Sequence, residues 1–183
     1  MSQPTKILVP LAEGFEEIEA VTIIDVLRRA GVDVTTAALT GQTVRGAHGI
    51  QVVADCTIDD VRESDFQGVV LPGGMPGSKH LREDPRILML LRLFAQTGRL
   101  TAAICAAPTA LAAAGLLTGR RATSYPGATL PGADYSEDKV VEDGPFMTSR
   151  GVGTALEFAL ALVRRLKGPA AASEHATKVL FQP

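Results

Sequence analysis

The sequence predicts an α/β fold in which helices cover both faces of a mostly parallel sheet. Strand-like and helix-like segments alternate along the chain, as they do where crossover helices join parallel strands. The chain has 183 residues, 46% of them hydrophobic, which is enough for one sizeable core. No repeat, low-complexity linker or break in composition divides it. We therefore predict a single domain over residues 1–183.

The first half of the chain is predicted to begin with a strand and a helix. Apolar residues recur at helical spacing after the first strand, and Gly31 ends that pattern. A polar, glycine-containing connection at Thr40–Gly49 leads to a short strand, and a buried strand ends at Pro72-Gly73-Gly74. The predicted elements are strands at Lys6–Leu11, Val32–Leu39, Ile50–Ala54 and Gly68–Leu71, a helix at Glu16–Ala30 and a helical turn at Ile58–Glu63.

The second half is predicted to hold two long helices and a less regular stretch, Arg120–Gly151. Within that stretch a turn at Asp143-Gly144-Pro145 separates two strands. The last helix is apolar almost all round, which predicts that it is buried, and the tail Ala170–Pro183 is ambiguous. The predicted elements are helices at Pro85–Gln96 and Thr154–Leu166 and strands at Leu100–Ile104, Lys139–Glu142 and Phe146–Ser149.

Charge and composition argue against several classes of partner. The net charge is −2, with no basic block and few aromatic residues, so we expect no nucleic acid contact. No apolar run approaches the ~20 residues of a membrane span, and the N-terminus lacks the regions of a signal peptide. We therefore expect a cytoplasmic protein without membrane contact. Two cysteines are too few for a disulfide framework, and the three histidines lie far apart, so we expect no metal.

Cys105 is the strongest candidate for chemistry. An apolar strand stops at this residue and a helix-prone run comes next, with Pro108 suited to the first helical turn. A thiol at such an elbow sees the positive end of a helix, which favours the reactive thiolate. We predict a reactive Cys105 and a structural Cys56, which has no such setting. Small residues leave room for the sharp turn, namely Ala102, Ala103, Ala106 and Ala107.

Two acidic residues of the first helix could face this cysteine. Glu19 lies on the buried stripe of the helix and Glu16 points near it, whereas Glu17 does not. Acidic residues also simply stabilise a first helical turn. A buried carboxyl, however, needs a partner or a raised pKa, and a protonated carboxyl beside a thiolate satisfies both groups. Their titrations would be coupled. Helical period does not choose between Glu16 and Glu19.

Three segments are expected to form one site. Right-handed crossovers bring the carboxyl ends of parallel strands to one edge of the sheet, where ligands bind. The segments are Glu13–Glu19, Gly73–Gly74 and Cys105–Ala107. The backbone N–H groups of Gly74 and Ala106 could hold a developing oxyanion near the sulfur. Arg150–Gly153 lacks the full dinucleotide-binding pattern and is interpreted as a helix entry.

Histidines and surface residues add two further expectations. A peptidase or amidase with a Cys–His pair needs a nearby base, and only His48 and His80 lie in loops that could reach the site. That function is therefore the weakest alternative. Ile18 and Val21 share a helix face with the charged Asp25 and Arg28, which hints at a partner surface. Scattered surface apolar residues would give the same pattern.

Five motifs together resemble the ThiJ/PfpI family, and especially its branch that contains the parkinsonism-associated protein deglycase and YajL. They stand in family order over nearly the whole chain. The resemblance implies a flavodoxin-like three-layer sandwich and a homodimer with Ile18 and Arg28 near its contact. The motifs are Ala12–Glu19, Asp25–Gly31, Val70–Gly74, Ala102–Leu111 and Thr148–Thr154.

The same resemblance implies a nucleophilic, oxidation-sensitive Cys105 with Glu19 as its partner carboxyl. The activities it implies are glyoxalase III-type and deglycase chemistry on methylglyoxal or early glycation adducts, without a cofactor. The alternative is a chaperone that senses oxidative stress, in which Cys105 is oxidised to a sulfinate.

Tyr125 marks a departure from part of the branch, which carries a histidine at this position. Without that histidine, Glu19 is expected to carry the proton transfer, with the Tyr125 hydroxyl orienting the substrate. A further hypothesis is that His48 reaches the site from a partner subunit.

Overall fold

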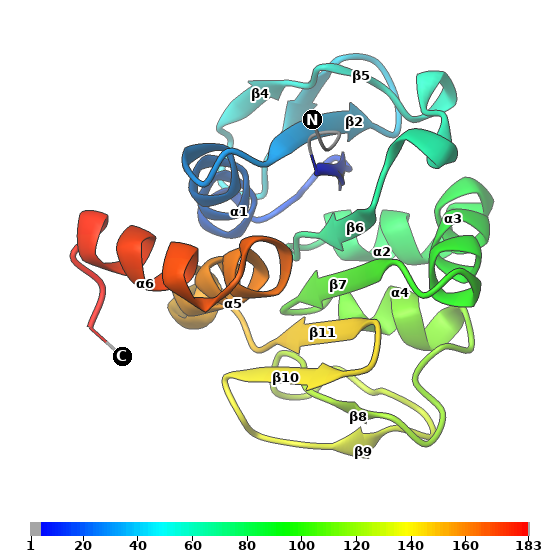
Figure 1. Cartoon of the computed structure of the whole chain (residues 1–183). Coiled ribbons are helices and arrows are strands. Elements are labelled where there is room, and N and C mark those ends of the chain that lie inside the picture. The colour runs from blue at the N-terminus through cyan, green and yellow to red at the C-terminus, as the bar shows by residue number, and fades with distance from the viewer. Residues whose placement is uncertain (1–4, 183) are drawn as a thin grey trace.

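A seven-stranded sheet forms the centre of the molecule (Figure 1). The computed structural model describes residues 5–182; residues 1–4 and 183 of the predicted domain lie outside the described residues. The strand order is β10-β11-β7-β6-β1-β2-β5, and every neighbouring pair is parallel except β10 with β11, which confirms the mostly parallel sheet. The strands are β1 (Lys6–Leu11), β2 (Asp33–Ala38), β5 (Cys56–Thr57), β6 (Gly68–Leu71), β7 (Leu100–Ile104), β10 (Val140–Asp143) and β11 (Phe146–Ser149).

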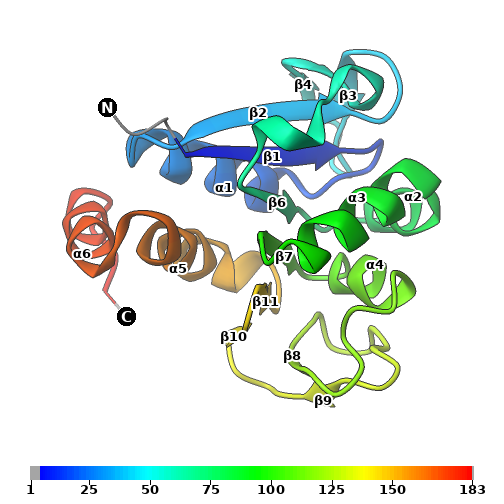
Figure 2. The same ribbon diagram turned by 45° about the vertical axis from the view of Figure 1, so that its right-hand side comes forward.

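Helices cover both faces of this sheet, as Figures 1 and 2 show. One layer contains α1 (Glu17–Arg29), α5 (Ala155–Lys167) and α6 (Pro169–Lys178). The other contains α2 (Gly77–Glu83), α3 (Pro85–Gln96) and α4 (Pro108–Ala113). The arrangement is the predicted three-layer sandwich. Short 3-10 turns occur at Ile58–Asp60, Glu63–Asp65 and Val152–Thr154.

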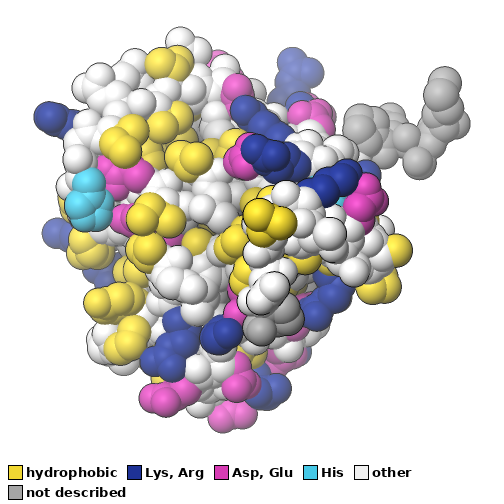
Figure 3. Space-filling view, turned by 90° about the vertical axis from the view of Figure 1, so that its left-hand side faces the viewer, with side chains coloured by type: hydrophobic (Ala, Val, Ile, Leu, Met, Phe, Trp, Pro, Cys, Tyr) yellow, Lys and Arg dark blue, Asp and Glu magenta, His cyan; other side chains and the backbone are white. Residues whose placement is uncertain are grey.

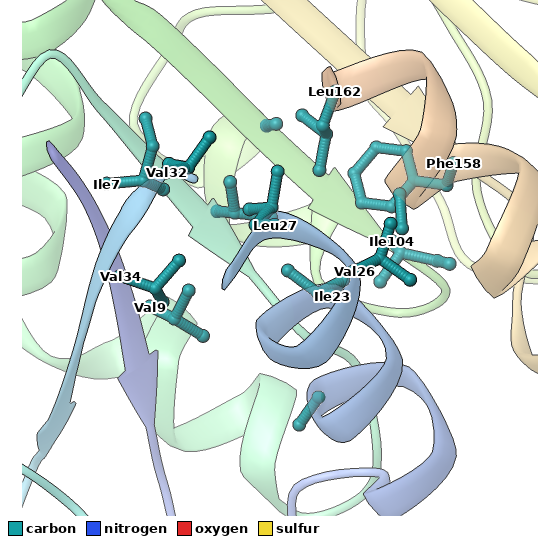
Figure 4. Close-up of a cluster of buried hydrophobic side chains, with 14 of the residues drawn as sticks. Ile7, Val9, Ile23, Val26, Leu27, Val32, Val34, Ile104, Phe158 and Leu162 are labelled. Carbon is teal, nitrogen blue, oxygen red and sulfur yellow. The ribbon is translucent and has the colours of Figure 1, made fainter. Parts of the chain in front are cut away.

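Two apolar clusters, one on each face, hold the layers together. Alternate residues of β1 point to opposite faces, so that Ile7 and Val9 join one cluster and Leu8 the other. Figure 4 shows the first cluster, in which Leu27 of α1 and Phe158 of α5 are packed with the strand residues. Burying each such side chain contributes about 1.5–3 kcal/mol. This packing fixes α1, and with it the first turn that carries Glu19, against the sheet.

The predicted bounds agree with the structure for β1, β6, β7, β11 and α3. The connection predicted at Thr40–Gly49 instead contains β3 (Thr43–Arg45), which pairs with β4 (Gln51–Val53) in a hairpin outside the central sheet. The prediction missed β3 because only its central residue, Val44, is apolar and buried. A second small pair joins β8 (Arg121–Ala122) to β9 (Asp134–Tyr135).

The helical predictions need three corrections. The glycine- and proline-rich loop after β6 leads into α2, which the sequence did not indicate, and the ambiguous tail forms α6. The last long helix, α5, is buried along its first turns only, because Arg164 and Arg165 are exposed. Within residues 5–182, no helix has the length and apolar character needed to span a membrane.

Candidate active site

The chain makes a sharp elbow at Cys105, between β7 and α4. Cys105 adopts φ +65°, a left-handed conformation that is uncommon and strained outside glycine. Hydrogen bonds hold the elbow on both sides: the Cys105 N–H donates to the Ser149 carbonyl at 2.9 Å, and the Tyr125 N–H donates to the Cys105 carbonyl at 2.8 Å. Pro108 occupies the first turn of α4, as predicted. The thiol is thereby held at the carboxyl edge of the sheet.

Glu19 is the carboxyl that meets this thiol. Its side chain is fully buried, and its Oε2 accepts the Gly73 N–H at 2.8 Å. Its Oε1 has no hydrogen-bond partner in the described part of the chain. Glu19 and Cys105 interact directly, and each shifts the pKa of the other. Glu16 has a different role, because it caps α1 by accepting the Ile18 N–H at 3.1 Å.

Gly73 allows these groups to approach one another. A Cβ atom at this position would lie 2.5 Å from Cys105 Cβ and 2.5 Å from Glu19 Oε2, which is too close for any side chain. Gly74 has φ +93° and lies against the backbone of Phe15 and Glu16. Both its conformation and this close backbone contact exclude a side chain at position 74. The two glycines therefore bring β6 within reach of both the nucleophile and α1.

Burial makes Glu19 hard to ionise. Removal from water raises the pKa of Glu19 to about 7, with opposing effects from the Gly73 N–H and the Cys105 side chain. The carboxyl is thus poised to hold or release a proton near neutral pH. Because Oε2 already accepts the Gly73 N–H, the free position for that proton is Oε1.

The pKa of the Cys105 thiol is raised, contrary to the expectation that the positive end of a helix favours the thiolate. Burial, followed by the charge of ionised Glu19, raises the pKa of the Cys105 thiol to about 12. The Gly74 and Ala106 backbone N–H groups hydrogen-bond to the thiolate and act in the opposite direction. Once the pair has lost one proton, the remaining proton can sit on sulfur or on the carboxyl. Transfer to Glu19 removes the carboxylate charge and leaves a thiolate that two amides stabilise.

The candidate oxyanion donors and Tyr125 are also at this site. The Gly74 and Ala106 amides lower the pKa of the Cys105 thiol, and their service to an oxyanion stays a prediction. A Cβ placed on Gly151 would lie 3.4 Å from Tyr125 Cδ2 and 3.9 Å from both Cys105 Sγ and Glu19 Oε1. The exposed Tyr125 ring therefore lies close to the pair, on the other side of Gly151.

Gly151 is the site residue that the sequence did not reveal. The pattern around it indicates only a helix entry, and Gly151 does precede the 3-10 turn leading to α5. The signal was topological: β11 runs parallel to β7 and Ser149 pairs with Ile104, so the segment that follows β11 must lie beside the segment that follows β7. Gly151, two residues after the end of β11, lies in that segment, and a Cβ atom on it would be 3.9 Å from Cys105 Sγ.

Glu17 is buried, contrary to the prediction from helical period. Its Oε1 accepts the His48 N–H at 2.6 Å, and its Oε2 lies 3.0 Å from His48 Nδ1. The β3–β4 hairpin carries His48 over the start of α1, and this tertiary contact buries Glu17. Hydrogen bonding to Glu17 raises the pKa of His48, and hydrogen bonds from the hairpin, above all from His48, hold the pKa of Glu17 low despite its burial.

Within residues 5–182, one group of side chains could hold a cation: the ligand atoms of His48, Glu16 and Glu17 lie within 4.8 Å of one another. Glu17 already uses both oxygens in hydrogen bonds to His48. Within residues 5–182, no histidine makes a hydrogen bond to Cys105; the buried His175 instead bonds to the Arg29 carbonyl. The approach of His48 from a second subunit stays a prediction. Cys56 lies at the sheet edge in β5, away from this site, as predicted.

Comparisons with known proteins agree with this architecture. The family model described as "DJ-1/PfpI family" matches residues 5–165. Protein dj-1beta of Drosophila melanogaster is 44% identical over 94% of this chain and 95% of its own length. The Caenorhabditis elegans protein named glutathione-independent glyoxalase DJR-1.2 is 40% identical over 89% of this chain and 88% of its own length. The chain spans about half the length of the Arabidopsis thaliana relatives, protein DJ-1 homologs A and B, at 47% and 43%.

Solved structures give the same result. The crystal structure of Drosophila melanogaster DJ-1beta superposes with a TM-score of 0.94 at 43% identity and covers 99% of this chain and all of that one. Oxidized Toxoplasma gondii DJ-1 has a TM-score of 0.93 at 38% identity, over 98% of this chain and all of its own. The elbow, the buried carboxyl and these matches lead to one conclusion: the chain belongs to the DJ-1/PfpI family.

Proposed function

We propose that this protein is a cofactor-independent glyoxalase and deglycase that acts on methylglyoxal or on early glycation adducts. The observation that carries the proposal is the buried Glu19 carboxyl, whose Oε1 has no partner in the described structure and which lies with the Cys105 sulfur against Gly73. Such a pair holds one proton between a nucleophile and a general acid–base group. The glyoxalase name of the 40% identical nematode relative supports the same chemistry.

The proposed reaction begins when the proton moves from Cys105 to Glu19. The thiolate attacks the aldehyde carbon of methylglyoxal, an S–C bond forms, and the carbonyl electrons move to oxygen, which the Gly74 and Ala106 amides stabilise. Protonation of that oxygen gives a hemithioacetal and leaves Glu19 ionised. The Tyr125 hydroxyl would orient the second carbonyl.

Glu19 then transfers protons within the adduct. It removes the proton from the carbon bonded to sulfur, which gives an enediol, and returns a proton to the neighbouring carbon. The product is a thioester of lactate with Cys105. Water hydrolyses the thioester, so the sum is methylglyoxal plus water giving lactate, with no external oxidant or reductant. On an early glycation adduct, a hemiaminal, the S–C bond would form as the C–N bond breaks, and the amine would leave with the proton held by Glu19, which gives the same hemithioacetal.

Lactate formation tests this proposal. Wild type, Cys105→Ala, Glu19→Gln and the control Cys56→Ala would receive methylglyoxal with a chelator and without glutathione. We expect lactate from wild type and Cys56→Ala and a loss of at least about a hundredfold in the other two, since each removes a group essential to acid–base and nucleophilic catalysis. Lactate formation that survives in both Cys105→Ala and Glu19→Gln would refute the proposal.

A second candidate function is redox sensing by Cys105, with chaperone activity under oxidative stress. It is supported by the same unpartnered Oε1, which as a protonated carboxyl could donate to a sulfinate oxygen, and by the relative solved in an oxidized form. Two equivalents of peroxide would convert the thiol to a sulfinate with release of two waters. Peroxide titration with intact-mass detection should add two oxygens at Cys105 before Cys56, and client aggregation assays on the same samples test the chaperone. Equal oxidation of both cysteines would contradict this function.

We also propose a homodimer through the face that joins α1 to the β3–β4 hairpin. Apolar side chains are exposed there, and Figure 3 shows hydrophobic groups gathered on this side of the molecule. Ile18 and Val21 are 56% and 49% exposed on α1, and Ile50 and Val53 are 58% and 70% exposed on or beside β4. Arg28, the other residue expected near the contact, pairs with Asp55 at 2.9 Å.

Light scattering on Ile18→Asp tests the dimer. A charge at the centre of an apolar interface should give a monomer, whereas Met89→Asp, on the opposite layer, should leave the mass at two chains. A wild-type monomer would rule the dimer out. A cytoplasmic location and the absence of nucleic acid and membrane contact stay predictions from the sequence.

A further inference from the structure

A cavity of about 300 Å³ lies against Ala106, the residue that follows the nucleophile. One wall is α2, and the opposite wall is the loop after Pro126. Ala106 is bonded to Cys105 in the chain and forms part of the lining, so the cavity begins one residue from the nucleophile. The proposed reaction uses the sulfur and its amides and leaves this space unused.

Two cations line the cavity. Lys79 and Arg82 stand three residues apart on α2 and therefore lie on the same side of the helix. Lys79 makes no ion pair within residues 5–182. Arg82 has only Glu83, at 3.6 Å, and both side chains are well exposed. Among the described residues, the lining includes no acidic side chain, so the cavity is positively charged.

Ser78 gives an independent indication of a ligand. Its side chain is 1% exposed and lines the cavity, yet its Oγ has no hydrogen-bond partner in the described structure. A buried hydroxyl without a partner is unfavourable, and such groups are uncommon in folded proteins. An oxyanion in the cavity would accept the Ser78 proton while Lys79 and Arg82 balance its charge.

We infer that this cavity is an oxyanion subsite that takes the carboxylate or phosphate group of a carbonyl substrate whose aldehyde reaches Cys105. As a substrate subsite it rests on the proposed carbonyl chemistry, whereas anion binding beside Cys105 does not require turnover. Methylglyoxal is neutral and would leave the subsite unfilled. Aldehydes and α-oxoaldehydes that carry an acidic group are therefore the preferred class.

Alkylation of Cys105 tests the subsite without any turnover. Iodoacetate and iodoacetamide transfer nearly the same group to sulfur with loss of iodide, but only iodoacetate is charged. Their relative rates would be measured by intact mass on wild type, Lys79→Gln, Arg82→Gln and Ser78→Ala. The control is Arg62→Gln, which removes an exposed positive charge from the segment before β6, at the opposite edge of the sheet.

We expect each α2 variant to lower the iodoacetate-to-iodoacetamide ratio by about threefold, and the control to leave it unchanged. The effect of the two cations should weaken as salt rises. Ser78→Ala changes no charge and removes an unsatisfied group, so its effect isolates the hydroxyl in a folded protein. A ratio unchanged in all three variants would overturn the subsite.

Added inorganic phosphate and acetate identify the preferred anion. Each anion should slow the alkylation of Cys105 by iodoacetamide in wild type but not in Lys79→Gln. The anion that slows alkylation more shows whether the subsite prefers a phosphate or a carboxylate group. Protection by neither would overturn the subsite. Methylglyoxal turnover separates the two proposals. If the wild-type protein prefers iodoacetate but does not turn over methylglyoxal, only the proposed function is refuted. If it turns over methylglyoxal but does not prefer iodoacetate, only the subsite is refuted.

Discussion

Replacing Glu19 by Gln should make the protein more stable and inactive at the same time. In the folded chain, burial raises the pKa of Glu19 to about 7 from an ordinary value of 4.5. The folded state therefore favours the protonated carboxyl. Below pH 4.5 both folded and unfolded chains hold this proton, and no stability is lost. Between pH 4.5 and about 7 the unfolded chain releases this proton while the folded chain keeps it, so stability falls across this range, and above pH 7 the loss is complete.

The size of the loss can be worked out from the pKa difference. At about 1.4 kcal/mol per unit, ionisation of Glu19 costs the fold about 3 kcal/mol above pH 7. Glutamine has no proton to lose, its carbonyl can accept the Gly73 N–H, and its amide nitrogen can occupy the Oε1 position that lacks a partner. The variant should therefore escape most of this loss.

Urea unfolding between pH 4.5 and 8 measures the difference. We expect the stability of Glu19→Gln relative to wild type to increase by about 3 kcal/mol from the low to the high end of this range. Cys105 stays protonated in this range because its pKa is also raised, so it adds little. Glu137→Gln removes an exposed carboxyl and serves as the control. A difference that is constant with pH, or that favours wild type as pH rises, would refute the reasoning.

Three further outcomes are expected from the same geometry. The rate of Cys105 alkylation by iodoacetamide should rise as pH passes about 7, where the Cys105–Glu19 pair loses its first proton; a rate that is flat until pH 9 would count against the pair. Gly73→Ala should lower the free energy of unfolding by about 1–3 kcal/mol or abolish folding, because its Cβ meets Cys105 and Glu19. Gly153→Ala is the control: its Cβ meets nothing within 4 Å, so the free energy of unfolding measured in urea should not change. Gly151→Ala adds a methyl group beside the sulfur without a clash, so thermal unfolding should be unchanged while kcat/KM for methylglyoxal falls; unchanged kinetics would remove Gly151 from the site.

The sequence predicted the sheet and its reactive edge because those features depend on local pattern. Apolar runs with clear ends indicated the bounds of β1, β6, β7 and β11, and the elbow was predicted from a strand that meets Pro108. Family resemblance then distinguished Glu19 from Glu16, which helical period alone did not. The structure gives the physical difference: Glu16 turns back to cap its own helix, and Glu19 enters the core.

The features that the sequence did not predict depend on contacts between distant segments. Glu17 is buried only because the β3–β4 hairpin folds over it, and one helix considered by itself carries no trace of that contact. Gly151 joins the site through the pairing of β11 with β7, on which the local helix-entry motif has no bearing. The pKa of Cys105 depends on a balance of burial, a carboxylate and two amides, which a nearby helix end does not decide.

This balance also connects the two proposed reactions of Cys105, carbonyl turnover and oxidation. Both reactions need the thiolate, and both obtain it when the proton moves to Glu19. They differ in the fate of the sulfur: an aldehyde adduct returns the proton and frees the sulfur, whereas a sulfinate keeps its negative charge beside Glu19. That charge favours the protonated carboxyl and so removes the base on which turnover depends. Oxidation of Cys105 should therefore abolish carbonyl turnover for two reasons: it consumes the nucleophile, and it keeps Glu19 protonated.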